Sequence, residues 1–388
     1  MEYICPNERC TGCYACHDAC PVSCITFRPD NQGFIRPNID RDSCIHCKKC
    51  QAVCPGLSPL YGKSEPRLFA ARALSSACRT HGSSGGIFGV FASYVVEHDG
   101  VVFGAAFDSD LNLRHINAET KPQLVPLYKS KYIQSDLSDI YKSVKTFCTS
   151  GRLVLFCGTP CQCAALRKFL RKEYTNLLII DFLCHGVPSQ NLWRNCLDAW
   201  ERKNKMKIIR FSFREKNKNL KRDHNFSLTA LDSKGREHNI IGPSYKFPYY
   251  YNYTNYTLFR PSCYECLYAK PKRISDITLG DFWHLQQILD ISSQDYRKGY
   301  SALMINTEKG ETMFDKSKNQ IWFKPLEIEI LKKLNPTLTN STSSTLITRQ
   351  SLADLGRLSH EEIEKRYMTI HMDVISRMIR FLKRRIRL

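Results

Sequence analysis

The sequence predicts a mixed α/β (α+β) protein in which a small cysteine-rich N-terminal module is joined to a larger α/β body and a basic C-terminal helix. Two four-cysteine runs lie within the first 60 residues, strand-like and helix-like segments alternate from residue 100 to residue 202, and arginines gather between residues 377 and 387. A chain of 388 residues is long enough for two or three domains with buried cores.

Both cysteine runs have the form Cys-x-x-Cys-x-x-Cys-x-x-x-Cys-Pro. This is the spacing of bacterial two-cluster ferredoxins, in which three thiolates of a run bind one 4Fe-4S cluster and the fourth binds the other. The predicted ligands of the first cluster are Cys10, Cys13, Cys16 and Cys54, and those of the second are Cys44, Cys47, Cys50 and Cys20. Zinc needs four ligands and not eight, and a disulfide framework suits a short secreted chain, so both alternatives fit less well. Cys5 and Cys24 flank the runs and are expected to be small buried residues.

The composition indicates a reducing compartment. The chain has 19 cysteines, no apolar run long enough to cross a bilayer, and an N-terminus without the features of a signal peptide. We therefore expect a cytoplasmic protein. The formal net charge of +20 would suit nucleic acid, an anionic membrane surface or an acidic partner. The basic stretch at 202–222 is expected to be a solvated surface.

A Gly-, Ser- and Pro-rich stretch at 56–66 is expected to link the ferredoxin-like domain, residues 1–60, to the body. Within that domain, 25–28 and 34–39 flank a turn and predict a hairpin. Further strands are predicted at 100–107, 152–157, 177–182, 208–214, 226–231, 277–279 and 302–306. Helices are predicted at 87–98, 138–149, 161–172, 190–202 and 361–388. The order of these elements up to residue 202 indicates parallel strands with crossover helices, while 249–256 has no regular pattern and 335–344 is expected to be a linker.

Four cysteines outside the ferredoxin-like domain are candidate metal ligands. Cys161 follows one predicted strand, Cys184 follows the next, and Cys263 and Cys266 form a Cys-x-x-Cys on an irregular loop. Since equivalent ends of neighbouring parallel strands meet in space, the four thiolates are expected to converge. Either a third 4Fe-4S cluster or zinc fits four sulfur ligands, and the spacing alone does not separate them.

A second candidate site is the glycine-rich loop at 81–86, which precedes a predicted helix and offers free N–H groups to a phosphate. A plain turn explains the same residues equally well. Arg79, Lys129 and Lys131 are candidate phosphate partners, or simply exposed charges.

Several landmarks in order give the chain a family resemblance. They are His-Gly-Ser-Ser-Gly-Gly at 81–86, Lys-Ser-Lys-Tyr-Ile-Gln at 129–134, Phe-Cys-Gly-Thr-Pro-Cys-Gln at 156–162, Asp-Phe-Leu-Cys-His-Gly-Val-Pro-Ser at 181–189 and Ser-Asp-Ile-Thr-Leu-Gly-Asp-Phe-Trp at 275–283. From Cys10 to Trp283 the chain resembles the beta subunit of coenzyme F-420 hydrogenase/dehydrogenase, in its bacterial form with an N-terminal two-cluster ferredoxin.

The resemblance implies an FAD-containing iron–sulfur oxidoreductase that passes electrons between 4Fe-4S clusters and the flavin. It implies a flavin-binding body in two parts, 67–150 and 151–330. The chain beyond Lys309 has no counterpart in the resemblance, and residues 331–388 are expected to form a linker and a basic amphipathic helical tail. The implied cofactor-binding residues are Ser83, Ser84, Gly85, Gly86, Lys129, Lys131, Gly158, Thr159, Pro160, Gln162, Gly186 and Asp281. It also favours a third cluster over zinc, although Cys157 and Cys163 leave the ligand role of Cys161 open.

His185 and Asp281 each have two interpretations. His185 is a candidate catalytic proton donor or a hydrogen-bonding residue of its loop, and Asp281 binds a cofactor or loop amide or caps a turn. The expected substrates are coenzyme F-420 or another organic compound, including a glycan-related one, and the expected partner is a ferredoxin-like donor or acceptor or reduced F-420. A relay subunit without its own substrate is the alternative; a nucleic-acid-binding module would need no clusters. The tail helix is compatible with peripheral membrane contact and with ordinary packing.

Overall fold

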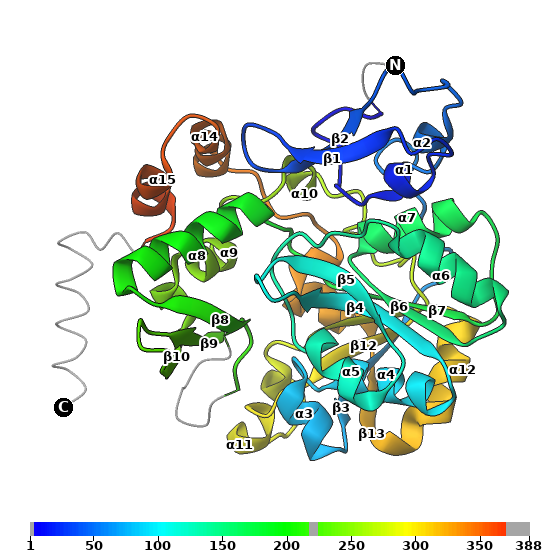
Figure 1. Ribbon diagram of the computed structural model, residues 1–388. Helices are drawn as coiled ribbons and strands as arrows, with labels where there is room; N and C mark the ends of the chain where they lie inside the picture. The colour runs from blue at the N-terminus through cyan, green and yellow to red at the C-terminus, as the bar shows by residue number, and fades with distance from the viewer. Residues whose placement is uncertain (1–3, 217–223, 370–388) are drawn as a thin grey trace, which may run out of the picture.

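The computed structural model of the protein describes residues 4–216 and 224–369, and its N-terminal residues form a small lobe on a larger body (Figure 1). This lobe contains α1 (Ala15–Asp18), β1 (Ile25–Pro29), β2 (Ile35–Ile39) and α2 (Lys49–Ala52). β1 and β2 form the predicted antiparallel hairpin. Its turn is held by Asp30, whose Oδ1 accepts the backbone N–H groups of Gln32 (3.0 Å) and Phe34 (2.9 Å).

The body is built on an eight-stranded sheet with the order β13-β3-β12-β11-β7-β6-β4-β5. In chain order its strands are β3 (Arg67–Ala73), β4 (Val101–Phe107), β5 (Leu113–Ala118), β6 (Val154–Cys157), β7 (Leu177–Phe182), β11 (Ile277–Asp281), β12 (Ser301–Ile305) and β13 (Ile321–Leu326). The central strands β4, β6, β7 and β11 are parallel, which confirms the predicted parallel arrangement, and the outer strands pair antiparallel.

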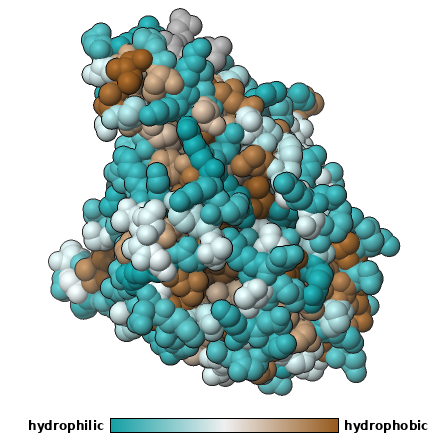
Figure 2. Space-filling model, turned by 90° about the vertical axis from the view of Figure 1, so that its right-hand side faces the viewer, coloured by the Kyte–Doolittle hydropathy of each residue, from teal (hydrophilic) through white to brown (hydrophobic). Residues whose placement is uncertain are grey.

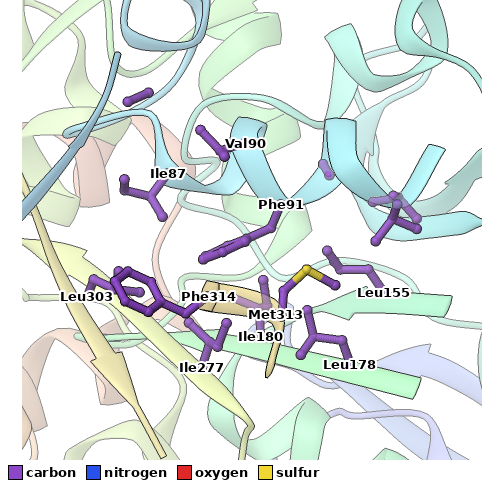
Figure 3. Packing of buried hydrophobic residues seen from close by; sticks show 14 of the residues in the cluster. Ile87, Val90, Phe91, Leu155, Leu178, Ile180, Ile277, Leu303, Met313 and Phe314 are labelled. Atoms are coloured by element: carbon purple, nitrogen blue, oxygen red, sulfur yellow. The ribbon is translucent and has the colours of Figure 1, made fainter. Parts of the chain in front are cut away.

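Helices cover both faces of this sheet, and this explains why its central strands are continuous apolar runs. One face carries α4 (Ile87–Glu97) and α12 (Glu308–Ser317), and the other carries α6 (Ile140–Thr149) and α7 (Pro160–Leu170). Figure 3 shows Phe91 of α4 lying over the strand residues Leu155, Leu178 and Ile180. Short helices complete the body: α3 (Ser76–His81), α5 (Lys121–Leu124), α10 (Pro261–Tyr264) and α11 (Ser293–Tyr296).

A three-stranded antiparallel sheet packs beside the body under α8 (Gln190–Asn204) and α9 (Pro248–Thr254). Its strands are β8 (Lys207–Ser212), β9 (Asn225–Leu231) and β10 (Glu237–Pro243). The expectation of no regular structure at 249–256 was wrong, because this segment contains most of α9. Tyr249 and Tyr250 of α9 are fully buried in an aromatic core around Trp193. Tertiary packing therefore stabilises a helix that has no amphipathic sequence pattern.

The tail contains α13 (Ile328–Leu334), α14 (Leu346–Leu355) and α15 (His360–Tyr367). The predicted linker at 335–344 lies against the body: Leu338 is buried, and Ser341 donates a hydrogen bond to the carbonyl of Tyr264 (2.8 Å). Of the predicted helix at 361–388, residues 361–367 lie in α15, which ends at Tyr367, and residues 370–388 with the arginines lie outside the described residues. No helix in the described part of the chain is long and apolar enough to cross a membrane. On the face shown in Figure 2, hydrophobic side chains form small separate spots in a mainly hydrophilic surface.

The ferredoxin-like lobe is docked on the body through α1, which packs against α6 and α7. The buried carboxylate of Asp18 accepts the backbone N–H groups of Asp139 and Tyr141, both at 2.9 Å, at the N-terminus of α6. Tyr141 in turn donates its hydroxyl to the carbonyl of Cys13 (2.8 Å). These contacts place a predicted cluster ligand directly against the body.

Candidate functional site

Eight of the ten cysteines in the ferredoxin-like lobe form two groups of four. Cys10, Cys13, Cys16 and Cys54 are neighbours in one group. Cys20, Cys44, Cys47 and Cys50 surround a small surface cleft in the other. Cys16 of the first group neighbours Cys50 of the second. Four sulfur donors at each position match the ligand set of a 4Fe-4S cluster.

A fifth thiol lies beside each group. Cys5 hydrogen bonds with Cys10 and Cys54, and the sulfur of Cys24 is 3.4 Å from that of Cys20. The hydrogen bond from Cys5 holds the pKa of the Cys10 thiol below its usual range against the effect of burial. Cys5 and Cys24 are both buried, as expected. The sequence did not predict that these two thiols lie beside the groups, because Cys5 and Cys24 are not part of the Cys-x-x-Cys-x-x-Cys-x-x-x-Cys-Pro runs.

Cys161, Cys184, Cys263 and Cys266 form a third group. Cys161 is in the first turn of α7 after β6, Cys184 follows β7, and Cys263 is in α10. Cys184 has the other three thiols as neighbours. Burial raises the pKa of Cys161 to about 11 and that of Cys263 to about 12, so without a cation these thiols would remain protonated at neutral pH. Four convergent sulfurs match the ligand set of a 4Fe-4S cluster, whereas no three of them lie within 4.8 Å of one another, as the bonds of about 2.3 Å in a tetrahedral zinc site would require.

The two additional thiols next to Cys161 have different surroundings. Cys163 points into the core and donates to the carbonyls of Gly158 and Ile180, both at 3.6 Å. Cys157 ends β6 and is not among the thiols that neighbour Cys184. Of the three cysteines in this turn, Cys161 is therefore the one that joins the third group.

The third group adjoins the ferredoxin-like lobe. Cys13 of the first group neighbours both Cys54 and Cys161. The buried hydroxyl of Tyr141 lies between the two groups, near the carbonyls of Cys13 (2.8 Å) and Gln162 (3.4 Å). The thiol groups thus form a continuous series from the surface cleft to the interior of the body.

The third group opens into a cavity of about 600 Å³, within the size range of small-molecule and cofactor sites. The sequence-predicted residues that line it are Ser83, Ser84, Gly86, Lys129, Lys131, Gly158, Thr159, Pro160, Gln162, His185, Gly186 and Asp281. Gly85 does not line the cavity. Its N–H donates to Ser301 Oγ (2.9 Å), and a Cβ at Gly85 would lie 2.5 Å from the carbonyl oxygen of Ala71, so close backbone packing explains this glycine.

The glycine-rich loop ends at Gly86, whose φ of 78° leads into α4 without a side-chain cap. An uncapped N-terminus at the cavity wall fits an anionic group such as a phosphate. Lys129 pairs with Glu215 (2.8 Å), and Lys131 donates to the carbonyls of Pro126 (2.6 Å) and Tyr128 (2.7 Å). Burial lowers the pKa of Lys131 to about 7. Arg79 instead pairs with Asp295 (3.3 Å) away from the cavity lining.

Asp281 connects the loop to a buried arginine. Its carboxylate accepts hydrogen bonds from Arg214 Nη1 (2.8 Å) and Nη2 (3.0 Å) and from the hydroxyl of Ser84. Burial opposes ionisation, but the Arg214 guanidinium holds the pKa of Asp281 below its usual range. Sequence reasoning missed Arg214, which lies in a predicted strand and a basic stretch without any motif.

His115 is a cavity residue that the sequence did not indicate. It is 5% exposed, and its Nε2 is 3.0 Å from the carbonyl of Cys157. Burial lowers the pKa of His115 to about 4, so the ring is neutral, Nε2 donates to the carbonyl, and Nδ1 carries a lone pair. Within the described residues this buried Nδ1 has no hydrogen-bond partner. An unused acceptor in the cavity wall fits a ligand that donates a hydrogen bond.

His185 lies at the aromatic side of the cavity. Its ring is stacked on Tyr256, with centroids 5.1 Å apart, and its centroid is 5.5 Å from that of Trp283. Burial lowers the pKa of His185 to about 4. The imidazole is therefore neutral at pH 7, and it can offer one N–H hydrogen or accept a proton.

Comparisons with known proteins agree with this organisation. Residues 9–56 match the family model of a 4Fe-4S dicluster domain, and residues 151–329 match that of the C terminus of the coenzyme F420 hydrogenase/dehydrogenase beta subunit. An uncharacterized ferredoxin of Methanocaldococcus jannaschii is 34% identical over 55 residues, which are 14% of this chain and 70% of the relative. A 7Fe ferredoxin of Hydrogenibacillus schlegelii is 40% identical over 63 residues, 16% of this chain and 72% of the relative.

Among solved structures, a chain of the xenon-derivatized F420-reducing [NiFe] hydrogenase complex from Methanosarcina barkeri is similar to this chain. The sequence identity is 16% and the TM-score 0.46, and the similarity covers 73% of this chain and 90% of that one.

The thiol groups and the dicluster match define an iron–sulfur electron-transfer protein. The predicted mixed α/β fold with an N-terminal ferredoxin-like module is confirmed. Residues 151–329 carry the C-terminal domain of the coenzyme F420 hydrogenase/dehydrogenase beta subunit, the family that the sequence landmarks indicated.

Proposed function

We propose that the protein is an FAD- and iron–sulfur-dependent oxidoreductase that passes electrons between three 4Fe-4S clusters and FAD, and so reduces or oxidises coenzyme F-420 or another organic substrate, such as a glycan-related compound. The observation that carries this proposal is the position of the third thiol group, which adjoins the ferredoxin-like lobe at Cys13 and opens into the cavity. Iron–sulfur clusters exchange single electrons, and a flavin combines two of them into a hydride equivalent.

The residues of the cavity suit a flavin nucleotide. The open N-terminus of α4 and the backbone around Gly86 would hold the pyrophosphate. The lone pair on His115 Nδ1 would accept a hydrogen bond from the ring or the ribityl chain. The Arg214–Asp281 pair would fix Ser84 and with it the conformation of the loop. Lys131, held by two carbonyls at this wall, has a pKa of about 7, and a pyrophosphate beside it would favour its charged form.

His185 would act on the substrate side. A neutral ring beside Tyr256 and Trp283 can donate a hydrogen bond from its N–H to a substrate atom that gains negative charge, and a planar substrate could pack on the same aromatic surface. This part of the proposal keeps His185 as the catalytic residue.

A second candidate function is a relay subunit, which accepts electrons at the ferredoxin-like lobe and delivers them to a partner protein. The exposed Cys47 beside the surface cleft favours protein-to-protein transfer at that end. The two functions share clusters and flavin, and they differ in what reoxidises the flavin.

Anaerobic purification followed by iron, sulfide and flavin analysis tests the shared part. We expect about twelve irons and one FAD per chain, given four irons per cluster. Zinc in the third group, or protein without flavin, would refute it. Mixing the reduced protein with F-420, and mixing the oxidised protein with reduced F-420, NADH or reduced ferredoxin, then separates an enzyme from a relay. Reoxidation by a partner protein alone would favour the relay.

A further inference from the structure

Arg260 is a buried arginine at the junction of the ferredoxin-like lobe and the body. It is 1% exposed and immediately precedes α10, which carries Cys263. Its guanidinium donates to the carbonyls of Cys10 (3.2 Å) and Ile35 (3.0 Å) in the lobe and to Gln134 Oε1 (3.0 Å) in the body. Arg260 therefore contacts the predicted cluster ligand Cys10 and lies three residues before the predicted ligand Cys263.

The charge of Arg260 has no carboxylate partner among the residues that the structure describes. The other arginines in the described core do have one: Arg79 pairs with Asp295, Arg214 with Asp281, and Arg273 with Asp181. The groups that contact Arg260 are carbonyl and amide oxygens and the ring of Phe34, whose centroid is 5.3 Å away. The charges of Arg36 and Asp30 also act on Arg260, but these two residues pair with each other at 2.9 Å. A buried charge without a counter-charge is strongly unfavourable, so an anion is expected nearby.

The neighbouring thiols supply that anion. The positive charge of Arg260 acts on Cys10 of the first group and on Cys161 and Cys263 of the third. A 4Fe-4S cluster with four thiolate ligands carries net negative charge, which increases on reduction. A Cβ on Gly12, where φ is +61°, would lie 2.6 Å from Arg260 Nη2. The first cysteine run thus leaves room for this guanidinium.

We propose that Arg260 is the counter-charge of the ferredoxin cluster bound by Cys10, Cys13, Cys16 and Cys54, and that it sets the reduction potential of this cluster. A fixed positive charge stabilises the more negative, reduced cluster and so raises the midpoint potential. Arg260 is a positioning and potential-setting residue and not a catalytic one. The inference rests on the iron–sulfur part of the proposed function alone and needs neither FAD nor a particular substrate.

The test compares Arg260→Met, which keeps most of the side-chain volume but no charge, with Arg260→Lys, which keeps the charge but loses the planar hydrogen bonds. The double variant Asp30→Asn/Arg36→Gln is the matched control, because Arg36 also donates to the Cys10 carbonyl (3.4 Å) but is paired with Asp30 at 2.9 Å, so removing both charges leaves the net charge unchanged. The full chain is purified anaerobically, iron and sulfide are counted, and the clusters are titrated with redox mediators and followed by EPR spectroscopy.

For Arg260→Met we expect one ferredoxin cluster signal to titrate at a lower potential. The ratio of reduced to oxidised cluster at a fixed potential should fall by about tenfold, or about 59 mV for one electron. Arg260→Lys and the control Asp30→Asn/Arg36→Gln should stay within about threefold of the wild type, because each keeps a positive charge at Arg260's position and leaves the net charge around the cluster unchanged. If Arg260→Met holds no cluster while Arg260→Lys holds both at the wild-type potential, the counter-charge role is also supported.

Two results would overturn the inference. One is an unchanged midpoint potential in Arg260→Met. The other is that the Met and Lys variants both lose clusters, or both show the same fall in potential, because the hydrogen bonds of Arg260 and not its charge would then be responsible. A wild-type protein with ferredoxin clusters but without FAD would contradict the proposed function and leave this test intact.

Discussion

The Arg214–Asp281 pair gives a quantitative test of how the cavity is held together. The Arg214 side chain is 9% exposed and that of Asp281 is 19% exposed, and two hydrogen bonds join them. Replacing Asp281 with Asn would leave the guanidinium of Arg214 buried without a counter-charge. Removal of one partner from a buried ion pair costs about 3–5 kcal/mol, and the partial exposure of Asp281 places the expected loss at about 3 kcal/mol.

The assay is anaerobic urea unfolding followed by tryptophan fluorescence. In the double variant Arg214→Met/Asp281→Asn the unpaired charge is gone, so its loss of stability should be smaller than the sum of the single losses by about 1–3 kcal/mol. Asp315→Asn is the control, because Asp315 pairs with Lys318 (3.0 Å) on the exposed surface, and it should change stability by about 0.5 kcal/mol or less.

The pH dependence sharpens this test. Because the folded pKa of Asp281 lies below its unfolded value of about 3.9, the stability that the pair contributes is present above that value and is lost as the pH falls through the folded pKa. The stability contributed by the Asp281 carboxylate itself should therefore be constant from pH 5 to pH 8. A change near pH 7 in the difference between wild type and Asp281→Asn would come from Lys216, whose pKa of about 7 the Asp281 charge raises. A loss below about 1 kcal/mol, or strictly additive single losses, would refute the reasoning.

Three further predictions concern the thiol groups and His115. Cys161→Ser should lower the iron content from about twelve to about eight per chain while Cys163→Ser leaves it unchanged, and equal loss in both would contradict the ligand assignment. Cys5→Ala should keep both ferredoxin clusters and Cys54→Ala should lose one, as counted by iron and sulfide analysis; cluster loss in Cys5→Ala would make Cys5 a ligand. Folded His115 stays neutral down to about pH 4, whereas the unfolded residue protonates near pH 6.5. The free energy of unfolding should therefore decrease as the pH is lowered from about 6.5 to about 4, by up to about 1.4 kcal/mol per pH unit. His115→Gln should reduce the measured slope in acid urea titrations by the contribution of one proton, because His185 and His224 also have folded pKa values of about 4 and keep theirs. An unchanged slope would show that His115 does not contribute to it.

The cysteine spacing shows that a short stretch of sequence can be enough to predict a metal-binding site. A ferredoxin run binds its cluster within a few residues, so the spacing of Cys10, Cys13 and Cys16 contains the geometric information by itself. The parallel core strands were recognisable for a related reason, because burial on both faces requires continuous apolar runs such as β7. The outer strand β5 and helix α9 lack a clear period, and packing against distant elements decides their conformation.

The sequence by itself therefore determined the fold class, the family and the cysteines that converge, since each depends on short-range spacing or on ordered landmarks. The tertiary structure alone decided which charges and lone pairs meet. Arg260 contacts Cys10, which is 250 residues away in the sequence. Arg214, Ser84 and Asp281, which meet in space, come from three separate segments of the chain. His115 likewise became a cavity residue only when β5 packed beside β4. Electrostatic partnership depends on distance in space and on exclusion of water, and neither quantity is written in the order of residues.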